Sequence, residues 1–383
     1  MKKWLLHMMW VSVLGMLTAS CSQEADDPTL AADKEKVMIR FTIALDEPKA
    51  ASRSWEGYDP ESGKKGEIGS VAENKIDPST VQVLIYDMNG TLMGELKEVT
   101  VDDPADDDAD NNQHLYNQHL YDLTGAFEAD ADQVAALDFK LMVFANATRM
   151  TNLNDIASLQ YEYAEGANIP MWGIATFEDV NLSESISVGT ATNVGNIYML
   201  RSMAKIEVSL SQESIDAGYT LTSATLNKAM KNGIVMPKLR KPDATADASI
   251  KDLVATTALG IDEVFNPLTG APRTNARFTE SDDDTFYIYV PEYDVATEDD
   301  ALQITLDFGD GNPKSFKHGL YSDGGYQNAW NVVRNHYYKY EVTVNSGEDL
   351  EIIITIKAWN KRKFAYPSQG IQGLPDATTS STN

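Results

Sequence analysis

Cysteine is nearly absent from this sequence, because Cys21 is the only one among 383 residues. A disulfide framework, a cysteine-based zinc site and an iron–sulfur cluster each need several thiolates, so the composition excludes all three. Packing must therefore stabilise the fold. With 43% hydrophobic residues the chain can bury a sizeable core, and its length predicts about two domains.

Basic residues are also scarce. The chain has 31 Lys and Arg against 58 Asp and Glu, which gives a formal net charge of −27. Binding to nucleic acid needs clustered cations that contact phosphates, so this composition argues against a nucleic-acid partner. An acidic, exported protein fits the balance better.

Motifs that carry chemistry are missing as well. The sequence has no nucleophile elbow, phosphate-binding loop, dinucleotide fingerprint or zinc-protease helix. Catalytic residues can also come together from distant positions, so a hydrolase stays a third hypothesis. The prediction is a protein that is not an enzyme and needs no metal or cofactor.

The N-terminus has the layout of a secretory signal over residues 1–20. Lys2 and Lys3 precede an apolar stretch over residues 4–17, and small residues lead to Cys21. The tract 17–21 resembles a bacterial lipobox, which predicts lipidation of Cys21 by diacylglyceryl and palmitate-type acyl chains. An ordinary signal peptide is the alternative. No later segment reaches 18 apolar residues, so no membrane span is expected.

A regular alternation begins after a tether over residues 21–35. Val37, Ile39, Phe41, Ile43 and Leu45 follow a strict period of two, which predicts a half-buried strand. The next segment, 46–77, is rich in glycine, proline, serine and charge, and is predicted to be a long exposed connection.

Many further short strands are predicted, and the pair Asn89-Gly90 indicates a hairpin. Only 152–160 and 223–231 suggest short helices. The pattern predicts a mostly β chain of two antiparallel β-sandwiches, since two sheets must cover each other's apolar faces. The expected domains are 36–196 and 197–365, followed by a mobile tail over 366–383. The other strands are expected around 81–85, 139–143, 200–210, 286–290, 302–308, 338–344 and 352–356.

Three polar clusters could bind ligands, but each has a simpler explanation. His114 and His119 belong to a duplicated pentad, and a spacing of five does not present them as a metal pair. Aspartates crowd 102–110 and could hold Ca²⁺ weakly, although the EF-hand order is missing. A solvated, self-repelling loop is favoured there. The turn 309–312 is expected to be a hairpin tip.

Three segments, taken in order, resemble the fimbrillins, the pilin-like lipoproteins of Gram-negative anaerobes such as the Bacteroides group. They are Ile169–Gly173, Met199–Val208 and Arg334–Tyr338, the last of which precedes a closing strand that ends at 358–360. Together with the lipobox, the order covers most of the exported chain. Each segment alone could equally be an edge or core strand of any sandwich.

The resemblance implies two transthyretin-like β-sandwich domains and export as a lipidated precursor. It also implies cleavage by a trypsin-like protease after an arginine beyond the first strand. Arg53, in the 46–77 connection, is the matching residue. Arg40 is the alternative, but it lies within the predicted strand, where a protease would reach it less readily.

The resemblance further implies assembly of a fimbrium by strand exchange. Cutting at Arg53 would release the 37–45 strand and open a groove for a strand from another pilus subunit. In this family the donor is generally the C-terminal segment, but here Pro367 and two glycines interrupt the alternation after 360. The expected partners are other pilus subunits, outer-membrane lipid before processing, and a possible host protein or glycan. The expected location is the outer membrane and cell surface.

A different class of function stays open. The chain could be a monomeric surface lipoprotein that binds glycan or host protein, with Trp55, Trp172 and Trp330 as stacking residues. Aromatic side chains bury well, so at least two of these are expected in the core.

Overall fold

The computed structural model describes the greater part of the chain from residue 34 onward. All of the described residues fall within one compact unit, which begins at Lys34. Cys21, Arg53, Trp55, His114 and His119, with residues 103–110 and the tail, lie outside the described residues. The described ranges are 34–45, 71–102, 120–238, 258–260, 267, 272, 274–281, 285–295, 297–319, 330–345, 350–358 and 363–365.

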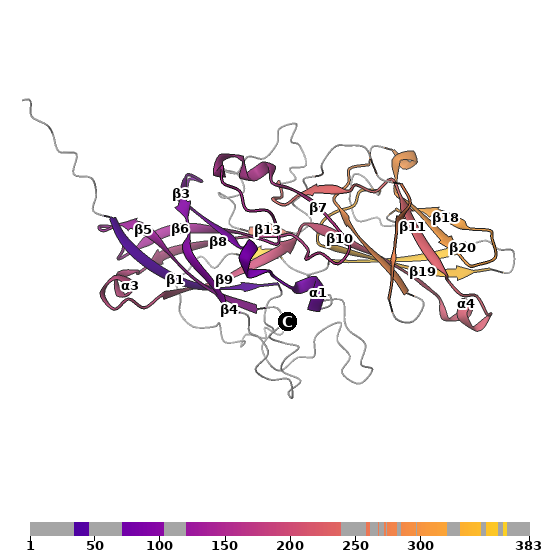
Figure 1. The fold of residues 1–383 in the computed structure, drawn as a ribbon, viewed down its shortest axis with the longest axis horizontal. Helices are drawn as coiled ribbons and strands as arrows, with labels where there is room; N and C mark the ends of the chain where they lie inside the picture. The colour runs from indigo at the N-terminus through magenta and orange to yellow at the C-terminus, as the bar shows by residue number, and fades with distance from the viewer. Residues whose placement is uncertain are drawn as a thin grey trace, which may run out of the picture. The chain divides into compact units, whose positions relative to one another are not determined.

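Strands dominate the fold, which confirms the mostly β prediction (Figure 1). The helices are short, and none in the described part of the chain is long and apolar enough to cross a membrane. The helical segments are α1 (Val71–Asn74), η1 (Pro78–Thr80), η2 (Leu153–Ser158), α3 (Ser183–Ser187), α4 (Gln212–Asp216) and η4 (Glu298–Asp300).

The N-terminal half forms an eight-stranded sheet. Its strands are, in spatial order, β3 (Leu92–Glu95), β2 (Gln82–Tyr86), β6 (Leu137–Ala145), β8 (Met171–Val180), β9 (Thr192–Arg201), β1 (Lys34–Ala44), β5 (Leu120–Asp130) and β4 (Lys97–Asp102).

This sheet folds over at β9 to make the two faces of a sandwich. The C-terminal end of β9 pairs with β8, while its N-terminal part pairs with β1. Phe127 of β5 and Phe139 of β6 lie four strands apart in the sheet order, yet their ring centroids are 5.8 Å apart. The two arms of the sheet therefore face each other across one apolar core.

The C-terminal half packs two separate sheets around a second core. Phe316 of the smaller sheet and Tyr340 of the larger one have ring centroids 5.2 Å apart across that core. The larger sheet has the order β15 (Thr279–Glu280), β16 (Thr285–Pro291), β10 (Met203–Leu210), β19 (His336–Val344) and β20 (Leu350–Ala358). The smaller has β14 (Ala276–Arg277), β11 (Ser223–Asn227), β17 (Gln303–Asp307) and β18 (Lys314–Lys317).

Two short ladders complete the described strands. β7 (Gln160–Glu162) pairs with β12 (Asn232–Ile234), and β13 (Ala258–Gly260) pairs with β21 (Lys363–Ala365).

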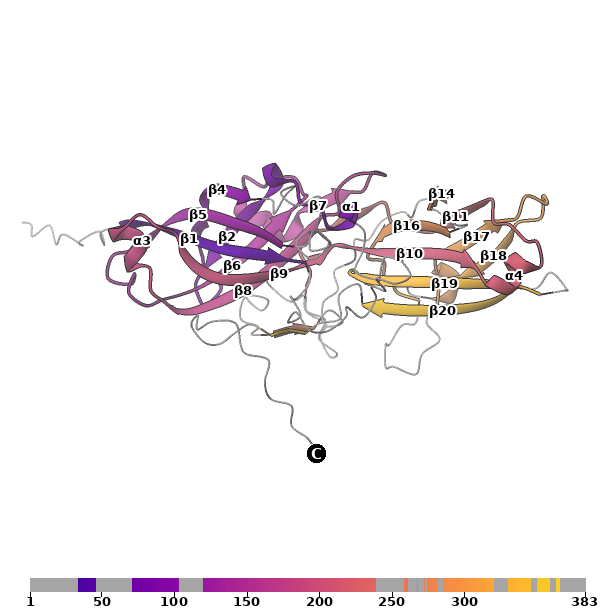
Figure 2. The same ribbon diagram turned by 90° about the horizontal axis from the view of Figure 1, so that it is seen from below.

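The two sandwiches depart from the purely antiparallel prediction at one place each. β1 runs parallel to β9, and β10 runs parallel to β19. All other strand pairs among the described residues are antiparallel, including β19 with β20 in Figure 2. Alternation in sequence reports which face a residue occupies and not which strand lies beside it, so the two parallel pairs carry no local signal.

Some of the predicted turns, helices and boundaries agree with the structure, and others do not. The hairpin at Asn89-Gly90 is confirmed, with Gly90 at φ 80°, although the loop is longer than two residues. The helix expected over 223–231 is wrong, since this stretch begins with β11. The expected division at 196/197 falls within β9. The second core begins at Ala204, although Val235, Met236, Tyr289 and Tyr337 belong to the first core.

Candidate functional site

The first strand, β1, is the centre of the candidate site. Val37, Ile39, Phe41 and Ile43 are all 0% exposed, and Leu45 just after the strand is 1% exposed. These are the five side chains that the alternating pattern placed on the inner face. They enter the first core together with residues of the facing arm of the sheet.

Both edges of β1 are occupied. The strand pairs antiparallel with β5 over its full length, from Lys34 opposite Asp130 to Ala44 opposite Leu120. On its other side it pairs parallel with β9 over Ile39–Ala44. Removing β1 would therefore expose two open strand edges and an apolar slot at once.

The outer face of β1 is held by charges and one hydroxyl. Lys34 Nζ lies 2.5 Å from Asp130 Oδ1, and Lys36 Nζ lies 2.7 Å from Glu98 Oε2. Thr42 donates to Asp122 at 2.6 Å. The lysines are more than half exposed, so their ion pairs contribute little compared with the buried inner face.

A bulge in β9 shapes the slot beside β1. The register shifts between Arg40 and Phe41, which stand opposite Asn193 and Gly195. Gly195 has φ 114°, a conformation that residues with a side chain rarely adopt. An extra residue of this kind locally disrupts the ladder and increases the twist of the strand that carries it.

Arg40 lies in a position that shields its peptide bond. It stands within β1, opposite Thr124 of β5 and Asn193 of β9. A protease binds an extended segment through that segment's own backbone groups, and here neighbouring strands flank both sides. The guanidinium itself is exposed and lies 4.0 Å from Asp122. The geometry disfavours cutting at Arg40 while the sheet is intact.

Helix α1 re-enters the described chain directly after the 46–70 connection, and Arg201 anchors it. Arg201 is 0% exposed and lies at the end of β9. Its Nε donates to the carbonyl of Glu73 at 3.3 Å, and its Nη2 donates to Asn74 Oδ1. The backbone N–H of Ile76 donates to the hydroxyl of Tyr121 in β5 at 3.0 Å. The chain beyond the connection is thus held by hydrogen bonds to β9 and β5.

The side chain of Glu73 extends this anchor into the larger C-terminal sheet. Its carboxylate is 2% exposed, accepts a hydrogen bond from the hydroxyl of Tyr289, and lies 2.9 Å from Lys205 Nζ. Burial and then the nearby Glu73 charge raise the pKa of Tyr289, so its phenol stays neutral and can donate. Lys205 also lies over the rings of Tyr287 and Tyr337, at 5.1 and 5.2 Å from their centroids.

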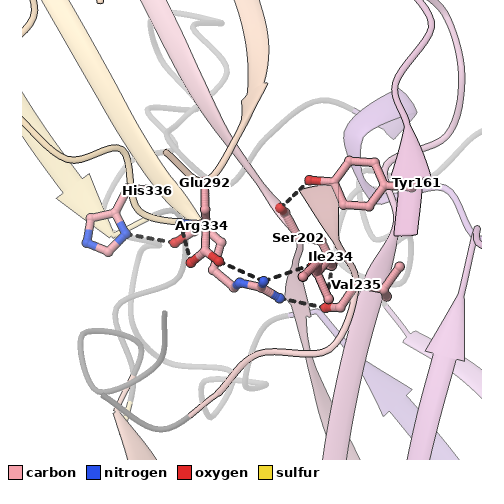
Figure 3. A network of polar contacts seen from close by, with 7 residues as sticks. All are labelled: Tyr161, Ser202, Ile234, Val235, Glu292, Arg334 and His336. Atoms are coloured by element: carbon pink, nitrogen blue, oxygen red, sulfur yellow. Dashed lines mark hydrogen bonds and ion pairs between the residues drawn. The ribbon is translucent and has the colours of Figure 1, made fainter. Parts of the chain in front are cut away.

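A second buried arginine holds a separate network, drawn in Figure 3. Arg334 is 1% exposed, and its Nη2 lies 2.7 Å from Glu292 Oε2. The same guanidinium donates to the carbonyls of Ile234 and Val235. Tyr161 donates to the carbonyl of Ser202 at 2.6 Å, and Ser202 Oγ donates to Val235 at 3.0 Å.

In both networks the charged groups face one another or backbone carbonyls in the core. The described residues also contain no group of three His, Cys, Asp or Glu side chains that could hold a metal ion. What the first sandwich offers is a strand with both edges paired and a core that depends on it.

Sequence reasoning found β1 but missed the buried arginines. Arg201 and Arg334 lay in segments used for the family resemblance, and neither side chain was given a role of its own. Helix α1 was predicted to be part of an exposed connection. A charged residue inside an apolar run, as in Met199–Ala204, is the signal that could have marked Arg201. Trp172 is 1% exposed and so offers no stacking surface, while Trp330 packs partly buried against the second core.

Comparisons with known proteins bear on the fold. No protein-family model matches the chain, and no curated protein is similar to it in sequence. Among solved structures, the tip fimbrial protein Mfa3 from Porphyromonas gingivalis, in a C-terminally truncated form, aligns with a TM-score of 0.51 at 11% identity. That alignment covers 85% of this chain and 100% of the other.

A second solved structure is a putative cell adhesion protein from Parabacteroides distasonis. It aligns with a TM-score of 0.46 at 15% identity and covers 84% of this chain and 97% of the other. Identities this low speak for shared architecture only. The chain therefore has a fold similar to that of the tip fimbrial protein Mfa3.

Proposed function

We propose that this chain is a fimbrillin-type structural or adhesive subunit of a fimbrium. It is exported as a lipoprotein precursor anchored through Cys21, cut after Arg53, and joined to other subunits by exchange of β1 for a strand of a neighbouring subunit. The fold similarity to a fimbrial tip protein supports the class of function. The geometry of β1 supports the mode of assembly.

One observation carries the proposal. β1 is paired on both edges and completely buried on its inner face, yet it connects to the rest of the fold only through the 46–70 segment. Arg53 lies in that segment. A single cut there leaves β1 bound by non-covalent contacts alone, while Arg201 and Tyr121 keep the chain after the cut in place.

The energetics favour replacement over an empty groove. Full burial of an aliphatic or aromatic side chain contributes about 1.5 to 3 kcal/mol, so five of them supply roughly 7 to 15 kcal/mol before ordering costs. A vacant slot would also leave the backbone groups of β5 and β9 unpaired. A donor strand from a second subunit would restore both the burial of apolar side chains and the pairing of these backbone groups. A head-to-tail exchange of this kind extends into a polymer.

The proposed partners follow from this scheme. Other pilus subunits supply or accept strands, and outer-membrane lipid holds the precursor before processing. The acidic surface suits a protein displayed outside the cell. A host protein or glycan is a further partner for an adhesive subunit.

The test replaces Arg53 with alanine and reads the N-terminus of the mature protein from cells by mass spectrometry. The unaltered protein should begin at Ser54. The Arg53→Ala precursor should instead begin at Cys21, with the mass of its acyl chains, and should no longer enter polymers. Adding Cys21→Ser should remove that lipid mass.

Arg40→Ala is the matched control, because it removes an exposed arginine from the paired strand without touching the connection. Its mature N-terminus should be the same as that of the unaltered protein. Cleavage at Arg53 is rejected if Arg53→Ala leaves the N-terminus at Ser54. The site moves to Arg40 if only the control variant blocks processing.

A further inference from the structure

The larger C-terminal sheet ends in a long and regular strand, β20. It pairs with β19 from Leu350 to Ala358 without a register shift. Within the described part of the chain no strand pairs with its other edge. A row of backbone donors and acceptors of this length can add another strand.

Other sheet edges of the molecule carry features that discourage such pairing. β18 has a lysine at each end. β4 has Glu98 at φ 54° and a register shift between Lys97 and Thr100. β14 and β15 contain two residues each. Charges, irregular backbone and shortness protect an edge, and β20 is the longest of these strands.

The composition of β20 favours association. Its sequence, LEIIITIKA, is rich in β-branched residues and contains neither proline nor glycine. Ile353 is 54% exposed, which makes it one of only four large hydrophobic side chains exposed among the described residues. Glu351 on the same face is also exposed.

We propose that a second copy of this chain pairs with β20, edge to edge and antiparallel, about a two-fold axis at Ile354. This register places Glu351 of one copy opposite Lys357 of the other, and places Ile353 opposite Thr355. Each pair occurs twice because of the symmetry. Opposite charges in directly facing positions stabilise antiparallel pairs.

Charge complementarity selects this occupant and this register. β20 carries one acid and one base, at equal distances in sequence from Ile354. Shifting the axis to Ile353 would bring Glu351 opposite Thr355 and leave the charges unmatched. The contact closes on itself as a dimer, so it is distinct from head-to-tail exchange at β1 and does not rest on the proposed function.

The test measures the dimerisation constant of the full chain, carrying Cys21→Ser to prevent lipidation, by sedimentation equilibrium. Glu351→Lys puts two cations opposite each other, and Lys357→Glu puts two anions opposite each other. Each should weaken the dimer about tenfold or more. The double variant Glu351→Lys with Lys357→Glu restores opposite charges and should return the constant to within about threefold of the starting value.

Glu341→Lys is the matched control. Glu341 is exposed on β19, inside the sheet, and the substitution makes the same change in net charge as Glu351→Lys. It should leave the dimer unweakened. The proposal is overturned by a chain that stays monomeric up to roughly 100 µM. It is also overturned by single variants that dimerise normally, or by a double variant that does not recover while circular dichroism shows all variants folded.

Discussion

Gly173 in β8 lies opposite Met199 in β9. A Cβ added there would lie 2.5 Å from the carbonyl oxygen of Tyr198 and 2.6 Å from the sulfur of Met199. The first contact is with backbone, which cannot move aside without disturbing the fold at β9. We predict that Gly173→Ala lowers the free energy of unfolding by about 1 to 3 kcal/mol, the usual effect of overpacking.

Gly94 in β3 provides the matched control for Gly173. Nothing lies within 4 Å of a Cβ built at Gly94. Gly94→Ala should therefore be neutral or stabilising by a few tenths of a kcal/mol, through the lower entropy of the unfolded chain. Urea unfolding midpoints measure both variants. Equal effects would show that the close approach of β8 and β9 does not restrict residue 173.

His318 is a neutral base inside the second core. It is 0% exposed, with Nδ1 2.5 Å from the hydroxyl of Tyr340 and Nε2 3.4 Å from the carbonyl of Asn331. A carbonyl can only accept, so Nε2 carries the proton and Nδ1 accepts from Tyr340. Burial lowers the pKa of His318 to about 4, which keeps the imidazole uncharged near neutral pH.

This lowered pKa predicts an acid-sensitive fold. Below the ordinary pKa of about 6.5 the unfolded chain binds a proton at His318 that the folded chain does not, so the stability falls as the pH falls. The loss runs at about 1.4 kcal/mol per pH unit down to about pH 4 and totals roughly 3 kcal/mol. Urea unfolding between pH 7 and 4.5 measures the slope.

His318→Gln removes the titration while keeping a polar side chain in the same place. Its free energy of unfolding should depend less on pH than that of the unaltered protein, by about 1.4 kcal/mol per unit below pH 6.5. Carboxylates titrate in both proteins, so the difference between the two slopes isolates His318. Parallel slopes would mean that His318 binds its proton as readily in the folded chain as in the unfolded chain.

At the scale of elements, alternation in sequence identified strands but not their neighbours. Strands such as β1 and β17 show buried and less buried residues in turn, so period two was a sufficient signal. Within 223–231, Ala224 and Leu226 carry the same alternation in β11, but polar neighbours concealed it. Partner choice depends on contacts between distant residues, which explains why both parallel pairs escaped prediction.

The candidate site was predictable to a different extent. The five inner residues of β1 were identified individually, because each apolar position reports its own burial. The anchor at α1 was not, since four helical residues between polar stretches carry no period. Its stability depends on Arg201, which lies far away in sequence and makes its hydrogen bonds only in the folded chain.

On the scale of the whole molecule, the chain has two separate apolar cores. The first core contains every inner residue of β1, and the second contains none. Removing β1 would therefore open the first sandwich while the second keeps its own sheets and packing. In the proposed assembly, this separation would allow β1 to be exchanged without unfolding the chain, because the second core contains no residue of β1.

We predict that β1 can be replaced by a peptide once the 46–70 connection is cut. A protease site inserted there, in the otherwise full chain, allows cutting without relying on Arg53. A labelled peptide of residues 34–45 should then bind in place of β1, whereas the uncut chain should not take it up. Phe41→Ala in the peptide should weaken binding by about 3 kcal/mol or more, since the ring is completely buried.

Arg40→Ala in the same peptide is the control. Arg40 is 52% exposed and 4.0 Å from Asp122, so its loss should cost less than about 1 kcal/mol. Fluorescence anisotropy of the labelled peptide measures both. If the groove recognises the apolar side chains of the strand in register, the fully buried inner face must contribute most of the binding free energy. If Arg40→Ala and Phe41→Ala weaken binding equally, the peptide is held by charge on the acidic surface and not in the slot that β1 occupies.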